Sequence, residues 1–329
     1  MKLNQKPNVL VVCPPGHYVL RNLASISERA NVWVGNDTQA LDERAPDAEI
    51  ILFSGLTGAT VDFADVWHHA QHAKWVHSLS AGVEKLLVPE FVASPVPLTN
   101  AKGVFKRSLA EFAIFGILFH YKHGRRLVEN QRAHRWDDFT VDWLPGKIMG
   151  VVGYGEIGRE CALLAHALGM RIHAVRRKPE QSSGDQIVER VFASHDLPQM
   201  LAEVDVLLAA APLTRDTRHL LSTREFETMK PSALVINVGR GPVIDEAALI
   251  AALEHKRIAG AALDVFEEEP LPASSPLWDM DNVLISPHCT DRTREPDWLD
   301  LAMKVFLENF DRYVEGEPLI NVVDKKAGY

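Results

Sequence analysis

The chain has 329 residues, of which 47% are hydrophobic and 24% charged, as is typical of a globular protein with about two domains. Asp and Glu number 44 against 35 Lys and Arg, so the formal net charge is −9, and we expect no general affinity for nucleic acid or for membranes. The 3 cysteines have unrelated spacings, no apolar run reaches the roughly 20 residues of a membrane span, and no signal-type core follows the N-terminus, so we expect a cytoplasmic protein.

The first hundred residues alternate between strand-like and helical patterns. Apolar runs predict strands over 9–13, 32–34, 49–54 and 75–78, and helical periodicity is found over about 18–30 and 61–72. This alternation predicts a small α/β domain.

A second alternation begins after Asn100 with a long apolar helix over about 108–123 and a polar connection that ends at Pro145-Gly146. Val/Ile/Leu/Ala-rich runs that barely alternate then predict a doubly wound parallel sheet with helices on both faces. The strands are expected at 148–152, 171–175, 206–210, 233–237, 259–264 and 283–286, with helices at 157–168 and 246–254. A C-terminal helix is predicted to begin at Glu295-Pro296-Asp297, to end at Gly316 and to pack on the first domain.

The sequence Gly153-Tyr154-Gly155-Glu156-Ile157-Gly158 lies between a predicted strand and a predicted helix. In this context glycines allow a tight turn and close approach of the backbone to a pyrophosphate, which the helix N-terminus then binds. A tight turn without a ligand is the alternative. The motif predicts a dinucleotide site formed by Gly153, Tyr154, Gly155, Glu156, Ile157 and Gly158.

The end of the next predicted strand indicates which nucleotide binds. NAD sites usually have an acidic residue there for the ribose hydroxyls, whereas this chain has Arg176, Arg177 and Lys178. Three cations can bind a 2′-phosphate by charge-assisted hydrogen bonds, so we expect NADP(H), with a solvated basic loop as the alternative. The same cations disfavour a methyltransferase, whose cofactor also presents a ribose diol at this position.

Three later segments resemble the D-isomer-specific 2-hydroxyacid dehydrogenases: residues 235–245, 263–270 and 285–289, which are VINVGRGPVID, LDVFEEEP and ISPHC. The resemblance implies a Rossmann-type NADP-binding domain over 101–292 and a smaller flavodoxin-like α/β substrate domain over 1–100 and 293–329. It also implies that Arg240 binds the substrate carboxylate and keto oxygen, that His288 is the general acid/base, and that Glu269 is its carboxylate partner.

The remaining expectations about the site also come from this resemblance. Asp264 is expected to contact the nicotinamide carboxamide, and the loop of Ser80, Ala81, Gly82 and Val83 to bind the substrate carboxylate, so that the active site lies between the domains. Further cofactor contacts are expected from Ala211, Pro212, Thr217, Val238, Gly239, Arg240 and His288.

The chain departs from the family pattern after His288, where small residues are usual and Cys289-Thr290-Asp291-Arg292 stand here. Glu84 replaces the commoner Asp after the carboxylate loop. In the resembling family the helix over 108–123 and the connection after it build a dimer, so a homodimer is expected, with Trp136 and Trp143 as anchors. His68, His69 and His72 have helical spacing but no Cys cluster nearby, and we expect no metal.

These observations favour an NADPH-dependent reductase that converts a small 2-keto acid to the D-2-hydroxy acid, with glyoxylate and hydroxypyruvate as candidates by resemblance only. Oxidation of another 2-hydroxy acid, such as phosphoglycerate or lactate, is an alternative within the class. A dinucleotide-sensing corepressor is the alternative from a different class.

Overall fold

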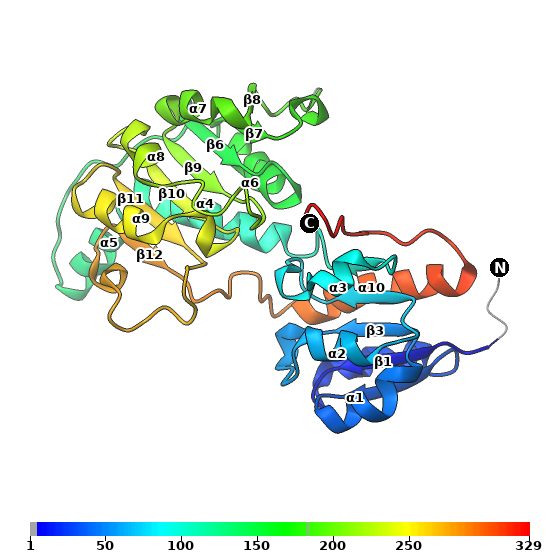
Figure 1. Ribbon diagram of the computed structural model, residues 1–329. Coiled ribbons are helices and arrows are strands. Elements are labelled where there is room, and N and C mark those ends of the chain that lie inside the picture. Colours follow the sequence, from blue (N-terminus) through cyan, green and yellow to red (C-terminus); the bar gives the residue numbers. More distant parts are fainter. Residues whose placement is uncertain (1–4, 183) are drawn as a thin grey trace. The chain divides into compact units, whose positions relative to one another are not determined.

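The computed structural model describes residues 5–182 and 184–329, which form two compact units (Figure 1). The first unit comprises residues 1–105 and 293–329, and the second comprises residues 106–292. The division after Phe105 lies a few residues beyond the expected boundary at 100, so that Ala101–Phe105 belong to the first unit. Each unit is built on its own parallel sheet, and the predicted α/β fold class is confirmed.

The first unit has a 5-stranded parallel sheet in the order β2-β1-β3-β4-β5, which is the flavodoxin-like order of a doubly wound sheet. Four of its strands lie where the apolar runs predicted them, and the short strand β5 was not predicted. The strands are β1 (Asn8–Val12), β2 (Asn31–Gly35), β3 (Ile50–Phe53), β4 (Trp75–Ser78) and β5 (Leu98–Asn100).

The helices of the first unit are short. They are the 3-10 helices η1 (Tyr18–Ile26), η2 (Ala45–Asp47), η3 (Gly55–Thr57) and η4 (Glu84–Leu86), and the α-helices α1 (Thr38–Arg44), α2 (Phe63–His69) and α3 (Pro89–Ala93). The helix expected over 18–30 is therefore a shorter 3-10 helix. Ser27 ends it, because both its backbone N–H and its hydroxyl donate to Ala24 O.

The C-terminal helix α10 (Trp298–Glu315) packs within the first unit, where it appears in orange and red in Figure 1. Asp297 caps its N-terminus by accepting from the N–H groups of Leu299 and Asp300, and Gly316 ends it in a left-handed conformation with φ 76°. Phe306 of this helix stacks on Trp75 of β4 with ring centroids 5.4 Å apart. The C-terminal helix thus packs on the core of the first sheet.

The second unit has a 7-stranded parallel sheet in the order β12-β11-β10-β9-β6-β7-β8. The order reverses between β6 and β9, which is the topological switch point at which doubly wound sheets bind nucleotides. The strands are β6 (Ile148–Val152), β7 (Arg171–Arg176), β8 (Arg190–Ala193), β9 (Val206–Ala209), β10 (Leu234–Asn237), β11 (Gly260–Leu263) and β12 (Val283–Ile285).

Helices surround this second sheet. They are α4 (Lys106–Tyr121), α5 (Gly124–Arg132), α6 (Glu156–Ala167), α7 (Leu197–Glu203), α8 (Thr223–Thr228) and α9 (Glu246–Glu254), with 3-10 helices η5 (Pro179–Ser182), η6 (Ser194–Asp196), η7 (Gly241–Val243) and η8 (Pro276–Asp279). Helix α4 approaches the sheet closely at Gly116, where an added Cβ would lie 2.7 Å from the Cβ of Ala262 in β11. The apolar character of α4 is therefore that of a helix packed on a sheet. Among the described helices, none combines the length and the apolar character needed to cross a bilayer.

Candidate active site

The predicted cofactor and catalytic residues of the second unit lie at the carboxyl ends of its parallel strands. Backbone hydrogen bonds extend the strand pairing past the carboxyl ends: Ala210 N–H donates to Val152 O at 2.8 Å, and Asp264 N–H donates to Asn237 O at 3.0 Å. Gly153 follows β6, Arg176 ends β7, Ala211 and Pro212 follow β9, Val238, Gly239 and Arg240 follow β10, Asp264 follows β11, and His288 follows β12. In doubly wound parallel sheets, the residues that bind a ligand lie beyond these carboxyl ends.

The glycines of the turn between β6 and α6 have different structural roles. Gly153 has φ 93°, and an added Cβ there would lie 2.4 Å from Ala211 N, while a Cβ on Gly158 would lie 2.3 Å from Gly153 O. Gly155 differs, because among the described residues no heavy atom outside its own turn of chain lies within 4 Å of the position of its Cβ. Gly153 and Gly158 are thus required by the fold, whereas the space at Gly155 allows a ligand to approach the backbone.

The N-terminus of α6 completes this turn. Gly155 is the N-cap residue and has no side chain that could accept a hydrogen bond from the first-turn N–H groups. Such a helix end has an anion-binding partial positive charge. Together with the open space at Gly155, it fits the pyrophosphate of a dinucleotide.

The three predicted cations lie at the end of β7. Arg176 is half-buried and ends the strand, while Arg177 and Lys178 are exposed. Burial and the nearby carboxylate of Asp185 raise the pKa of the Tyr154 phenol, and the charge of Arg176 acts in the opposite direction. Arg176 therefore lies within electrostatic range of the glycine-rich turn.

His288 and Glu269 form a hydrogen-bonded pair. His288 Nδ1 lies 2.7 Å from Glu269 Oε2, and the two side chains are 41% and 35% exposed. The hydrogen bond that His288 donates to Glu269 raises the pKa of His288 despite partial burial. Burial alone would raise the pKa of Glu269, but hydrogen bonds from His288 and from Phe266 N–H, with the charges of His288 and Arg240, hold it below its usual value. The pairing thus favours the protonated imidazole of His288 and the ionised carboxylate of Glu269.

The backbone of His288 has φ 48°, in the left-handed region that residues other than glycine rarely occupy. Such conformations cost free energy and are concentrated at functional sites, so this conformation is consistent with a role for the imidazole.

Hydrogen bonds within its own turn hold Arg240 in place. The buried side chain of Asn237 donates to Arg240 O at 3.1 Å and accepts from Gly239 N–H at 3.1 Å, and Arg240 Nη1 donates to Gly239 O at 2.8 Å. The Arg240 charge contributes to the pKa values of both His288 and Glu269, so the three predicted catalytic side chains lie within electrostatic range of one another. The clamping role of Asn237 was not predicted, although Asn237 lies inside a motif that we singled out.

The turns that carry Arg240 and Glu269 are in direct contact. An added Cβ on Gly241 would lie only 1.7 Å from Phe266 O, so only glycine fits there. Phe266 N–H in turn donates to Glu269 Oε1 at 3.0 Å. The positions of the arginine and the carboxylate are thereby coupled through the backbone.

Asp264 is 1% exposed and is surrounded by donors from the segment after His288. Its Oδ1 accepts from the N–H groups of Cys289 and Thr290 at 3.2 and 3.3 Å, and its Oδ2 accepts from Thr290 Oγ1 at 2.7 Å. Thr290 thus uses its hydroxyl to fix Asp264, a contact that the sequence did not predict. Asp291 is half-buried, its Oδ1 is sealed from solvent without a hydrogen-bond partner, and burial raises its pKa.

The predicted loop after β9 is fixed by Thr217. Its hydroxyl donates to Pro212 O at 2.6 Å and accepts from Thr214 N–H at 2.8 Å. Ala211, in the same loop, contacts both the first glycine of the nucleotide turn and the backbone at Gly239. The loop therefore packs against both the turn after β6 and the turn after β10.

The predicted carboxylate loop, Ser80–Val83, belongs to the first unit and follows β4. Ser80 N–H donates to Ser78 Oγ at 3.2 Å, and Ala81 O accepts from Asn100 Nδ2 at 2.6 Å. In the part of the chain that the structure describes, the N–H groups of Ala81, Gly82 and Val83 donate to no protein acceptor. The loop is anchored at its ends and presents donors suited to a carboxylate.

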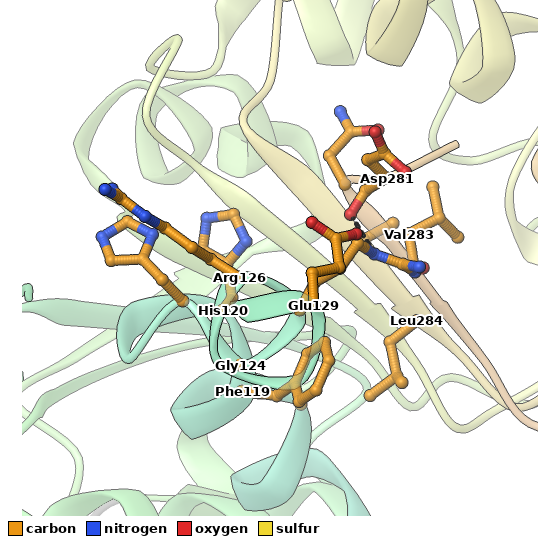
Figure 2. A pocket seen from close by; sticks show the side chains of 13 residues that line it. Phe119, His120, Gly124, Arg126, Glu129, Asp281, Val283 and Leu284 are labelled. Carbon is orange, nitrogen blue, oxygen red and sulfur yellow. Dashed lines mark hydrogen bonds between the residues drawn. The ribbon is translucent and has the colours of Figure 1, made fainter. Parts of the chain in front are cut away.

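A separate pocket of about 290 Å³ lies in the second unit between α4, α5 and β12. Figure 2 shows His120 and Arg126 on one side of Glu129, with Asp281, Val283 and Leu284 on the other. Its lining includes none of the predicted catalytic residues. Within the described residues, no group of three or more His, Cys, Asp or Glu is arranged to hold a metal ion, and His69 instead lies 3.1 Å from Asp42.

Comparison with known proteins identifies the family. The family model of the D-isomer specific 2-hydroxyacid dehydrogenase, NAD binding domain, matches residues 114–290. A glyoxylate reductase from Aeropyrum pernix is 35% identical over 278 residues, which cover 80% of this chain and 80% of that protein.

Solved structures agree over nearly the whole chain. A D-isomer specific 2-hydroxyacid dehydrogenase from Xanthobacter autotrophicus, in complex with NADPH and MES, has a TM-score of 0.83 at 29% identity and covers 99% of this chain and 100% of that one. An NADPH-dependent glyoxylate/hydroxypyruvate reductase from Sinorhizobium meliloti, in complex with NADP and sulfate, has a TM-score of 0.83 at 26% identity and covers 98% and 100%. With the matching family model and the ordered motifs at the sheet edge, these likenesses show that the chain belongs to the D-isomer specific 2-hydroxyacid dehydrogenase family.

Proposed function

We propose that this protein reduces a small 2-keto acid of the glyoxylate or hydroxypyruvate type to the D-2-hydroxy acid, with NADPH as the hydride donor. The observation that carries the proposal is the His288–Glu269 pair, with His288 Nδ1 2.7 Å from Glu269 Oε2 at the sheet edge that also bears the nucleotide turn. Relatives named glyoxylate reductase and glyoxylate/hydroxypyruvate reductase support this substrate class.

The three side chains divide the work of ketone reduction. A bound reduced nicotinamide would supply a hydride to the carbonyl carbon, and the carbonyl oxygen would then need a proton. His288, whose protonated form Glu269 favours, donates that proton from its other ring nitrogen, Nε2. Arg240 is always charged and stabilises both the substrate carboxylate and the negative charge that develops on the keto oxygen.

The preference for NADPH rests on Arg176, Arg177 and Lys178. A 2′-phosphate adds negative charge that these side chains can bind by charge-assisted hydrogen bonds, whereas the free ribose hydroxyls of NADH offer no charge to bind. The structures of relatives with NADP or NADPH bound support the same preference. For the rest of the cofactor we assign the pyrophosphate to Gly153–Gly158 and the nicotinamide end to Asp264, with contacts from Ala211, Pro212, Thr217, Val238 and Gly239.

For the substrate carboxylate we assign the N–H groups of Ala81, Gly82 and Val83, with Ser80 anchoring the start of their loop. Backbone N–H groups without protein acceptors are the donors that a small anion requires in an otherwise acidic protein.

We further propose that the protein is a homodimer that forms through the segment from α4 to Trp143. Large apolar side chains are exposed along this segment, among them Phe115 (52%), Trp136 (100%) and Trp143 (73%). Exposed aromatic side chains are enriched at subunit interfaces.

We also propose a cytoplasmic location, which the three free thiols Cys13, Cys161 and Cys289 fit.

The deciding experiment is a panel of 2-keto acids assayed by loss of NADPH absorbance, with NADH in parallel. We expect one small keto acid to give a high kcat/KM with NADPH, and Arg176→Asp to lower kcat/KM with NADPH and raise it with NADH. Fast oxidation of phosphoglycerate or lactate with negligible keto acid reduction would assign the alternative within the family. Negligible turnover throughout, with tight NADPH binding, would favour a dinucleotide-sensing role.

A further inference from the structure

The loop between β7 and β8 is tied back to the nucleotide turn at Asp185. Asp185 Oδ2 accepts from Tyr154 Oη at 3.1 Å and from Arg159 Nε at 2.8 Å, while Asp185 Oδ1 accepts from Ile187 N–H at 3.4 Å. Tyr154 lies between the first two glycines of the turn, and Arg159 follows the third. One carboxylate thus connects the loop to both sides of the glycine-rich motif.

The carboxylate of Asp185 and the side chain of Tyr154 are largely buried. The side chain of Asp185 is 14% exposed, and Tyr154 is buried with 5% of its surface exposed. Burial works against ionisation of Asp185, but the hydrogen bonds from Arg159 and Tyr154 outweigh it and hold its pKa below the usual value. The carboxylate is therefore charged at neutral pH, and its charge is paired with Arg159.

The cations expected to bind the 2′-phosphate lie at the other end of the same loop. Arg176 ends β7, Arg177 and Lys178 follow it directly, and the chain reaches Asp185 a few residues later. Anchoring this loop at Asp185 restricts the conformations open to the cations at its start. A loop ordered before binding loses less conformational entropy when the phosphate binds.

We propose that Asp185 is a positioning residue for cofactor selectivity, which holds the Arg176–Lys178 segment in place for a 2′-phosphate through its bonds to Tyr154 and Arg159. This inference rests on the proposed use of NADPH. Pairing with Arg159 also removes the repulsion that a bare carboxylate near the phosphate would cause. Because NADH has no 2′-phosphate, loss of the tie weakens NADPH binding selectively.

The test compares Asp185→Ala and Tyr154→Phe with the control Asp311→Asn. Asp311 Oδ1 lies 2.7 Å from Arg29 Nη2 in the first unit, so the control breaks an ion pair that involves neither the nucleotide turn nor the loop between β7 and β8. For Asp185→Ala we expect KM for NADPH to rise roughly tenfold and KM for NADH less than about threefold, with kcat within about twofold. Tyr154→Phe, which removes one neutral donor, should raise KM for NADPH by roughly threefold, and the control should change neither.

Direct titration of NADPH fluorescence without a keto acid keeps this test independent of the proposed reaction. A wild-type protein that binds NADPH but reduces nothing contradicts the reaction alone, and the Asp185 variants are then compared by their affinities for NADPH and NADH. Equal weakening of both nucleotides, or no change, would overturn the positioning role. If Asp185→Ala does not fold, judged by thermal melting, Tyr154→Phe and Asp185→Asn decide the question by the same nucleotide comparison.

Discussion

Glu269 contacts His288 with one carboxylate oxygen and its own turn with the other: Oε2 lies 2.7 Å from His288 Nδ1, and Oε1 accepts from Phe266 N–H at 3.0 Å. The backbone bond fixes the carboxylate, and the carboxylate fixes the imidazole. Since Nδ1 is engaged, Nε2 is the nitrogen left to exchange a proton with a substrate. This relationship fixes the orientation of His288 and raises the pKa of its imidazole.

Glu269→Gln should move the pH profile of keto acid reduction to lower pH. The carboxylate raises the pKa of His288, and reduction needs the protonated imidazole, so activity is lost as the pH rises through that pKa. Without the charge the pKa falls and the loss begins at lower pH. The measurement is kcat/KM against pH; a uniform drop at all pH values with an unmoved midpoint would contradict the assignment.

Arg240→Ala should lower kcat/KM for keto acids by about 10²–10³-fold, because a fixed cation no longer stabilises the developing negative charge. Arg240→Lys should restore little of this, since an ammonium group lacks the planar fork that binds a carboxylate at two points. NADPH affinity, measured by fluorescence titration, should fall much less than kcat/KM in both variants, because the glycine-rich turn and the basic residues after β7 are unchanged. Equal activity of the Lys variant and the wild type would show that charge alone suffices.

Gly155→Ala and Gly158→Ala should fail in different ways. The Cβ of Ala at 155 meets no heavy atom within 4 Å, so the protein should fold with an unchanged Tm but bind NADPH poorly, because the methyl group fills the space left for the pyrophosphate. The Cβ at 158 would lie 2.3 Å from Gly153 O, so the turn must shift and Tm should fall. The two variants are compared by thermal melting and NADPH titration. Normal NADPH binding by Gly155→Ala would remove the turn from the proposed cofactor site.

Long buried runs and strong caps made much of the fold predictable. Strand β6 (Ile148–Val152) and helix α9 (Glu246–Glu254) lie at the residues expected, the strand because its interior is entirely apolar and the helix because Asp245 accepts from Ala248 N–H at its start. The catalytic residues could be expected at one sheet edge because each follows a strand of the same parallel sheet.

Elements with little buried surface were missed. Strand β8 (Arg190–Ala193) is at the edge of its sheet and fully buries only Phe192, so it shows no apolar run. Helix α5 (Gly124–Arg132) buries only Asn130, so its polar sequence predicts a connection and not a helix. The hydrogen bond between Asp185 and Tyr154 joins residues 31 positions apart. It depends on the conformation of the loop after β7, which no local sequence pattern predicts.

Asp291→Asn should stabilise the protein at neutral pH. Oδ1 of Asp291 is sealed from solvent without a partner, and burial, followed by the charge of Asp264, raises the pKa of the carboxyl group against the opposing effect of His288. A raised pKa means that the folded state holds this proton more tightly than the unfolded state. The ionised form therefore destabilises the fold at every pH above the folded pKa, and this penalty fades as the pH falls through that value towards the unfolded one.

Removing the charge should thus stabilise the fold by about 1 kcal/mol at pH 7, seen as a rise in Tm of roughly 2–4 °C, and the gain should shrink on acidification. Thermal melts of the wild type and Asp291→Asn across this pH range measure the effect, with the exposed Asp138→Asn as a control expected to change little. A lower Tm for Asp291→Asn at pH 7 would mean that attraction to the protonated His288 outweighs the cost of burial. In that case Asp291 would act with Glu269 in keeping the imidazole charged, and its loss would also move the pH profile of reduction downwards.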